Sequence, residues 1–345
     1  MKKILFVAAS AILLAAGCQK TEVLNQAVGD PMTFSTEMSK LTKSATADGM
    51  DNLKAQNFKV WAYTAYEDAL NNVNRGKVYK EINGTQVSYV KDQNAWGTTT
   101  EYYWPGTNRE LDFFAVSTGT TPTVSIGDKA GQESLARTMT VTSYTVDHTK
   151  PNDDLMVADF VRQHQGMNDK AVSLKFRHAL SKVQFKFVTT VTANSTDKVV
   201  INGLKVAGLN VTGNLNVTEG TEEADASTGV KKVSLAWDES SLTGAGDNVV
   251  FSQEKDLELT AEAQSYAAWL VLPQSIAGLT LVVDYTIQGK EKLTFDHTFA
   301  LATASVSSWA INKVTTYTIN ISPNKISFSP SVEKWDDETP VTDGN

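Results

Sequence analysis

The side chains that could do chemistry in this sequence are few and scattered. There are four histidines: His148, His164, His178 and His297. They form no His-Glu-x-x-His motif, and no pair has the spacing of metal ligands on a helix. The Ser-x-x-Lys spacings at 195–198 and 331–334 lack both a helix start and the partner motifs that would make the serine a nucleophile. With no Gly-x-Ser-x-Gly elbow and no phosphate-binding glycine loop, the sequence predicts a protein without enzymatic activity or cofactor.

The remaining candidate ligands also favour a structural interpretation. His178 and His297 fall on apolar faces of predicted strands, where a partly buried structural histidine is expected rather than a base. Three acidic clusters occur, at 153–154, 222–225 and 336–338. None alternates oxygen ligands as a calcium loop does, so solvated loops are expected. The seven tryptophans could stack on carbohydrate, but in a β-rich protein they more often fill the core or its rim.

Cys18 is the only cysteine, and its position is informative. Lys2 and Lys3 precede an apolar run of 13 residues, and small residues lead into the cysteine. This layout is typical of a secretory signal, because a membrane span needs ~20 apolar residues. It resembles a lipoprotein signal, with Ala15 where a larger aliphatic residue is usual. We expect residues 1–17 to be the signal peptide and Cys18 to carry the lipid; a chance cysteine after an ordinary signal is the alternative.

Charge and length narrow the class of protein. The formal net charge is −8 and the pI is near 5.1, which disfavours a nucleic-acid partner. A lone cysteine leaves no disulfide and no thiolate metal site. The chain has 345 residues, enough for two domains of ~100–200 residues each.

Alternating apolar residues dominate the rest of the chain and predict half-buried strands. Residues 279–287 and 293–301 alternate around a polar loop and predict a hairpin. The alternation changes phase at Ser181-Lys182, which predicts a bend or bulge and a change of sheet. The polar segment 159–170 is the expected linker. Many short strands and almost no helix predict an all-β fold of two sandwich domains, at 18–165 and 166–345.

Several segments resemble the fimbrillin family, the Mfa-like and FimA-like type V pilus subunits of Bacteroides-type bacteria. They are Asp154 to Ala158, Leu174 to Val183, Tyr317 to Ile321, Ile326 to Pro330 and Trp335-Asp336. The resemblance implies two tandem transthyretin-like β-sandwich domains and no enzymatic activity. It also implies a surface fimbria that serves cell adhesion, built head-to-tail from fimbrillin subunits.

The family's assembly mechanism implies roles for the first strand. In the family, a trypsin-like protease removes an N-terminal segment, and a strand of the next subunit fills the vacated groove. The removable strand would be 32–38, with Phe34 and Thr36 on one face, and cleavage would follow Lys40 or Lys43. The first arginine is Arg75, so an arginine-specific protease could not release this strand alone. Either a lysine-tolerant protease acts, or the subunit keeps its leader strand.

The same mechanism implies a donor strand at about 326–335. Its expected anchors are Ile326, Phe328 and Val332, and the alternative is a permanent edge strand. The implied location is the outer membrane, reached as a lipoprotein, and then the surface fimbria, with a host or bacterial receptor as a further partner. A non-polymerising, carbohydrate-binding surface lipoprotein remains the competing hypothesis, and stalk, tip and anchor roles are not separated.

Overall fold

The computed structural model describes residues 30–38, 40–41, 49–65, 76–106, 109–128, 137–148, 150, 153–167, 171–191, 197–244, 249–251, 256–289, 292–322 and 325–337. Strands make up most of these residues, which confirms the all-β expectation. The helical elements described are α1 (Gly49–Gln56) and the short 3-10 turns η1 (Lys91–Gln93) and η3 (Glu239–Ser241). None of the described helices has the length and apolar character to cross a membrane.

A nine-stranded sheet forms the first lobe. In spatial order its strands are β15 (Val230–Lys231), β10 (Phe160–Gln163), β6 (Leu111–Ser117), β3 (Phe58–Thr64), β4 (Val78–Val90), β5 (Ala95–Gly97), β1 (Thr33–Met38), β11 (Ala171–His178) and β9 (Met156–Ala158). β9 also pairs with β6. The strands β6, β3, β4, β5, β1, β11 and β9, in this spatial order, therefore close into a ring. We call this closed set of strands the ring.

Apolar side chains fill the ring and also cover part of its outside. Alternate residues of β3 and β6 point to opposite faces, as in any strand. Phe58 and Phe113 therefore join the core inside the ring, whereas Trp61 and Phe114 join a second core outside it. Both strands are buried on both faces, which explains their nearly continuous apolar sequences.

A smaller sheet covers this outer face. Its strands are β16 (Val233–Trp237), β14 (Asn210–Glu219), β8 (Arg137–Thr145) and β7 (Thr123–Asp128), and β17 (Thr243–Gly244) pairs with β14. Met139, Leu215 and Trp237 from this sheet pack in the same core as Trp61 and Phe114. The first lobe is thus a ring with a sheet stacked on one side.

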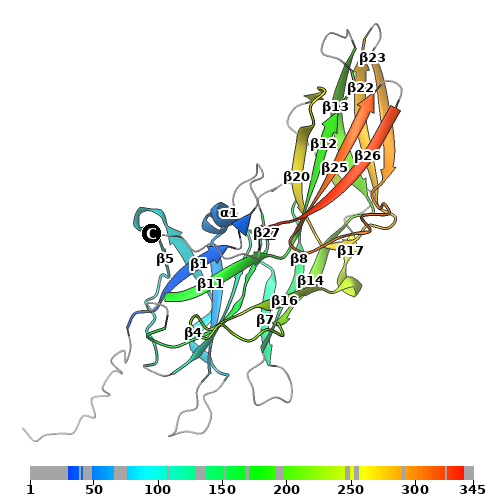
Figure 1. Ribbon diagram of the computed structural model, residues 1–345. Helices are drawn as coiled ribbons and strands as arrows, with labels where there is room; N and C mark the ends of the chain where they lie inside the picture. Colours follow the sequence, from blue (N-terminus) through cyan, green and yellow to red (C-terminus); the bar gives the residue numbers. More distant parts are fainter. Residues whose placement is uncertain are drawn as a thin grey trace, which may run out of the picture.

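The second lobe is a sandwich of two sheets (Figure 1). One contains β20 (Gln264–Val271), β12 (Ser181–Val188), β25 (Lys313–Ser322) and β26 (Lys325–Lys334); the other contains β18 (Val249–Phe251), β13 (Lys198–Ala207), β22 (Thr280–Gln288) and β23 (Lys292–Ala300), with β19 (Leu257–Glu258) on β13. Two further pairs are short: β21 (Gln274–Ser275) with β24 (Ser308–Trp309), and β2 (Lys40–Leu41) with β27 (Asp336–Asp337).

Two local predictions are confirmed. β22 and β23 pair antiparallel as the expected hairpin. The phase change at Ser181-Lys182 separates β11, which lies in the ring, from β12, which lies in the second lobe. A one-residue shift of the alternation therefore coincides with the passage of the chain from one sheet to another.

Sheet membership does not follow the expected boundary between residues 165 and 166. β11, β14, β15 and β16 come after it, yet all pair within the first lobe. The expected linker includes β10, and Asp159 at its start is buried. The carboxylate of Asp159 accepts two hydrogen bonds of 2.8 Å from the guanidinium of Arg177 and one from the backbone N–H of Val233. Asp159, a polar residue of the expected linker, thus belongs to an internal ion pair with Arg177. The two-domain, transthyretin-like division remains a prediction.

Candidate functional site: the place of the first strand

β1 occupies an internal place in the ring, between β5 and β11 (Figure 1). It runs parallel to β11 from Thr33, opposite Ala171, to Met38, opposite Phe176. On its other side Phe34 pairs with Trp96 of β5. Removal of β1 would leave unpaired backbone groups on two neighbouring strands. Binding of another strand would pair these groups again and is therefore favoured.

The inward side of β1 is apolar and closely packed. Phe34 is only 7 % exposed, and its ring meets Phe58 edge-on with 6.3 Å between centroids. Thr36 lies on the same side, and its Oγ1 accepts a hydrogen bond of 2.8 Å from Nε1 of Trp96. The ring of Trp96 in turn contacts Phe58 at 5.0 Å. Phe34 and Thr36 therefore share one face, as the alternation requires; their displacement during assembly remains a prediction.

The residues just before and just after β1 also make backbone contacts with other parts of the chain. Before the strand, the N–H of Met32 donates to the carbonyl of Tyr102 at 2.7 Å. After it, β2 pairs with β27, so that Lys40 lies opposite Asp337 and Leu41 opposite Asp336. The candidate cleavage residue Lys40 thus lies beside the segment that follows β26. No sequence signal could reveal this contact, because it joins two strands of two residues from opposite ends of the chain.

Two other candidate residues, Lys43 and Cys18, lie outside the described residues. The same holds for Arg75, the first arginine of the sequence. The predictions of lipid attachment and of cleavage after Lys43 therefore stay predictions.

β26 is an edge strand of the second lobe. It pairs antiparallel with β25 along its whole length, and no strand is described on its other side. Phe328 is half-buried and stacks between Tyr317 and Phe299, with centroids 5.0 and 5.3 Å away. Ile326 also packs against this core, whereas Val332 is 47 % exposed. The three expected anchors therefore differ: Ile326 and Phe328 pack against the core, and Val332 is largely exposed.

The chain after β26 is anchored on the first lobe. Trp335 is 5 % exposed and stacks on the imidazole of His178, with 3.8 Å between ring centroids. Nδ1 of His178 hydrogen-bonds with Oδ2 of Asp154, and both side chains are buried. The ammonium group of Lys182 lies over the Trp335 ring, 5.9 Å from its centroid, and burial lowers the pKa of this ammonium group. This cluster connects the start of the second lobe, the end of the chain and the ring.

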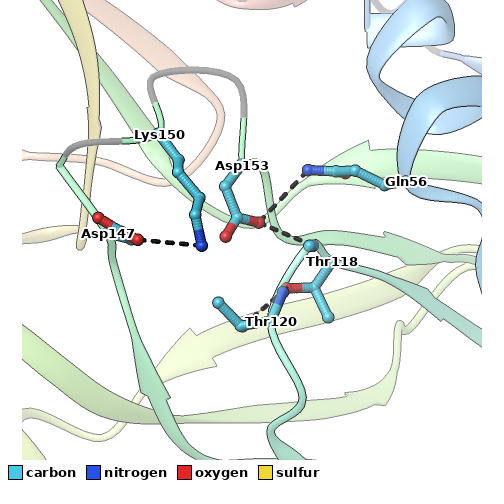
Figure 2. Close-up of polar contacts among 7 residues, drawn as sticks. Gln56, Thr118, Thr120, Asp147, Lys150 and Asp153 are labelled. Carbon is cyan, nitrogen blue, oxygen red and sulfur yellow. Dashed lines mark hydrogen bonds and ion pairs between the residues drawn. The ribbon is translucent and has the colours of Figure 1, made fainter.

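Some expectations for polar residues were wrong. Asp153 and Asp154 were expected in a solvated loop, but both are buried, because Asp153 accepts hydrogen bonds from the N–H of Gly119 and from Nε2 of Gln56 (Figure 2), and Asp154 hydrogen-bonds with His178. His297 was expected to be partly buried, but it is exposed on β23, which lies at the edge of its sheet. His178 is a buried, hydrogen-bonded histidine, as predicted. Six of the seven tryptophans are buried and Trp96 is half-buried, which agrees with a core role.

Comparison with known proteins agrees with this architecture. The sequence pattern of the family described as fimbrillin-like matches residues 42–335. A solved fimbrial protein from Bacteroides vulgatus is 17 % identical, has a TM-score of 0.54, and aligns over 89 % of this chain and 100 % of its own. A candidate cell adhesion protein from Bacteroides ovatus is 13 % identical, with a TM-score of 0.49 over 90 % of this chain and 99 % of its own. No curated protein sequence matches the chain. At 17 % identity, the likeness to the Bacteroides vulgatus protein is one of fold.

Proposed function

Because the chain belongs to the fimbrillin-like family, we propose that it is a structural subunit of a surface fimbria that serves cell adhesion and polymerises by exchange of β1 for a strand of the next subunit. The observation that carries the proposal is the internal place of β1. A strand that lies between two partners and covers an apolar interior can be replaced only by another strand that restores the same pairing.

The proposed course of assembly follows from these contacts. The subunit is exported as a lipoprotein anchored at Cys18, and a lysine-tolerant protease cuts after Lys40 or Lys43. β1 then leaves, and the segment around β26 of another copy enters between β5 and β11. Such a contact joins two different surfaces, so it runs head-to-tail and grows a fibre rather than a closed dimer. The family suggests a structural role without catalysis.

β26 suits the donor role through its position. It lies at the edge of its sheet, so only one neighbouring strand would lose its partner if it left. Ile326 and Phe328 alternate with Ser327 and Ser329, which gives the strand one apolar and one polar side. The apolar side could fill the space that Phe34 and Thr36 occupy in the monomer.

Limited trypsin digestion of the protein from residue 18 onward, with Cys18→Ser, tests the proposal. Native gels should show a ladder of oligomers that appears with cleavage near Lys40 or Lys43, as read by mass spectrometry. Phe328→Asp should abolish the ladder. Ser329→Asp, which adds the same charge to the exposed side of the same strand, should leave it intact. A cleaved protein that stays monomeric at all concentrations would contradict strand exchange.

A further inference from the structure

β26 repeats the residue pattern of β1 and of the residue just before β1. Residues 32–38 read Met-Thr-Phe-Ser-Thr-Glu-Met, and residues 326–332 read Ile-Ser-Phe-Ser-Pro-Ser-Val. In the same chain direction, both segments have an apolar residue at the first, third and seventh positions, with small or polar residues at the second, fourth and sixth. The third and fourth positions are identical, so that Phe34 corresponds to Phe328 and Ser35 to Ser329.

The two segments also share the order of buried and exposed side chains. On each, the first, third and fifth positions are buried or half-buried, and the second, fourth and sixth are exposed. The buried or half-buried residues are Met32, Phe34 and Thr36 in one segment and Ile326, Phe328 and Pro330 in the other. The seventh position differs, because Met38 is half-buried but Val332 is 47 % exposed. A strand with this order can present the same side to the interior of the ring as β1 does.

The alternation alone leaves more than one register open. Shifting a strand by two residues keeps the same side chains directed at the interior. Such a shift would put Ile326 or Pro330 where Phe34 now lies. Only the unshifted register places Phe328 against Phe58, which Phe34 meets edge-on with 6.3 Å between ring centroids. Because changes that conserve volume disturb a packed core least, this register is favoured.

The last residue of the pattern selects the direction of entry. β1 runs parallel to β11, and Met38 packs against the core inside the ring. A donor strand in the same direction brings Val332 to this place, where its exposed side chain would be covered. In the opposite direction, with Phe328 still in the place of Phe34, the polar residue Asn324 would arrive there instead. Burial of an amide without a partner is unfavourable, so the parallel direction is preferred.

We propose that the donor strand binds parallel to β11 in the register of β1, so that Phe328 of one copy replaces Phe34 of the next and Ser329 lies opposite Ser173. The inference rests on the proposed strand exchange and adds to it the direction, the register and the residue that selects them. β1 is then an internal substitute for the donor strand. Before cleavage, it keeps β5 and β11 at the spacing that the strand of another subunit requires.

One contact distinguishes the two strands. Oγ1 of Thr36 accepts a hydrogen bond of 2.8 Å from Nε1 of Trp96, whereas Pro330 at the same place has no side-chain acceptor. Proline also lacks an N–H, so the donor strand loses at most one backbone hydrogen bond there. The site therefore favours β1 over the donor strand, which agrees with a need to cut β1 away before exchange.

Disulfide trapping between two copies tests the register. The acceptor copy carries Ser173→Cys, and the donor copy carries one of three changes on the exposed side of β26: Ser327→Cys, Ser329→Cys or Ser331→Cys. Both copies begin at residue 18 with Cys18→Ser, and they are mixed, cut with trypsin and oxidised. Non-reducing denaturing gels and mass spectrometry of the linked peptides then report which donor position is joined to the acceptor.

We expect Ser329→Cys to give the linked pair and the other two changes to give about 10-fold less of it. A shift of two residues displaces a Cα atom by ~6.6 Å along the strand, and a disulfide joins Cα atoms at most ~7 Å apart. Ser35→Cys combined with Ser173→Cys in one uncut chain is the matched reference, because these residues are register partners there.

The outcomes separate the register from strand exchange itself. A ladder of oligomers with stronger linkage through Ser327→Cys or Ser331→Cys overturns the inference and leaves strand exchange standing. A ladder without linkage at any of the three positions does the same. Absence of both the ladder and the linkage contradicts strand exchange, and the proposed register falls with it.

Discussion

Truncation of Phe34 to alanine gives the most direct measure of the place that β1 fills. Phe34 is 7 % exposed and packs edge-on against Phe58 inside the ring. Phenylalanine-to-alanine changes in a core cost ~3–5 kcal/mol. The smaller figure is appropriate here, because β1 keeps its backbone pairing with β11 in the variant. A loss of about 3 kcal/mol corresponds to about a 100-fold change in affinity for a strand that binds from solution.

The assay uses β1 as a separate ligand. The protein from residue 42 onward lacks β1 and β2, and a synthetic peptide of residues 30–41 supplies them. Binding can be followed by the fluorescence of Trp96, whose Nε1 donates to Thr36 in the intact chain. We expect the wild-type peptide to bind and the Phe34→Ala peptide to bind about 100-fold more weakly. A Glu37→Ala peptide, altered on the exposed side of β1, should differ from the wild type by less than threefold.

Two results would refute this reasoning. If the Phe34→Ala peptide bound within threefold of the wild type, the apolar interior would not select the strand. If the Glu37→Ala peptide lost affinity equally, the loss would not come from the inward face of β1.

Two further predictions follow from described contacts. Ser35 and Ser173 are register partners on β1 and β11, so cysteines at both positions, in a Cys18→Ser background, should form a disulfide. After trypsin cleavage of this variant, oligomer ladders on native gels should appear only once a reductant is added. Burial raises the pKa of Tyr317 to about 12, above its usual value of 10. The neutral phenol therefore stabilises the second lobe fully below pH 10, and this stability, roughly 2–3 kcal/mol, is lost as the pH rises from 10 to 12. Denaturant melts of Tyr317→Phe should show a smaller loss over that range; an unchanged loss would contradict the assignment.

The sequence predicted the elements better than their association. The hairpin of β22 and β23 and the change of sheet after β11 follow from period-two alternation, which is a local property. Closure of the ring by β6 and β9 depends on the pairing of Val116 with Val157 and of Ser117 with Met156, and no alternation specifies which apolar strand meets which. For the same reason, the sequence did not predict that β14 pairs within the first lobe.

Buried charges misled the prediction in another way. Asp153 and Asp159 look like loop residues, because an aspartate is rarely buried without a partner. Their partners, Gly119 and Arg177, are 34 and 18 residues away. Because both stretches are polar, the strand β10 was predicted to be a linker and residues 153–154 were predicted to be a solvated loop. The apolar face of β1 was predictable from Phe34 and Thr36, but its internal place depends on partners in β5 and β11.

The ring gives a physical reason why cleavage could trigger assembly. β1 is paired on both sides, and the chain just after it is tied through β2 to β27, which follows β26. While the chain is intact, β1 cannot diffuse away, since a strand tethered beside its own groove returns far faster than another copy arrives. A cut after Lys40 separates β1 from this tether and turns its return into a bimolecular event. Because β27 pairs with the same short segment, the cut also falls beside the end of the proposed donor strand. One proteolytic step could therefore free the groove and loosen the end of the strand that fills the groove of the next subunit.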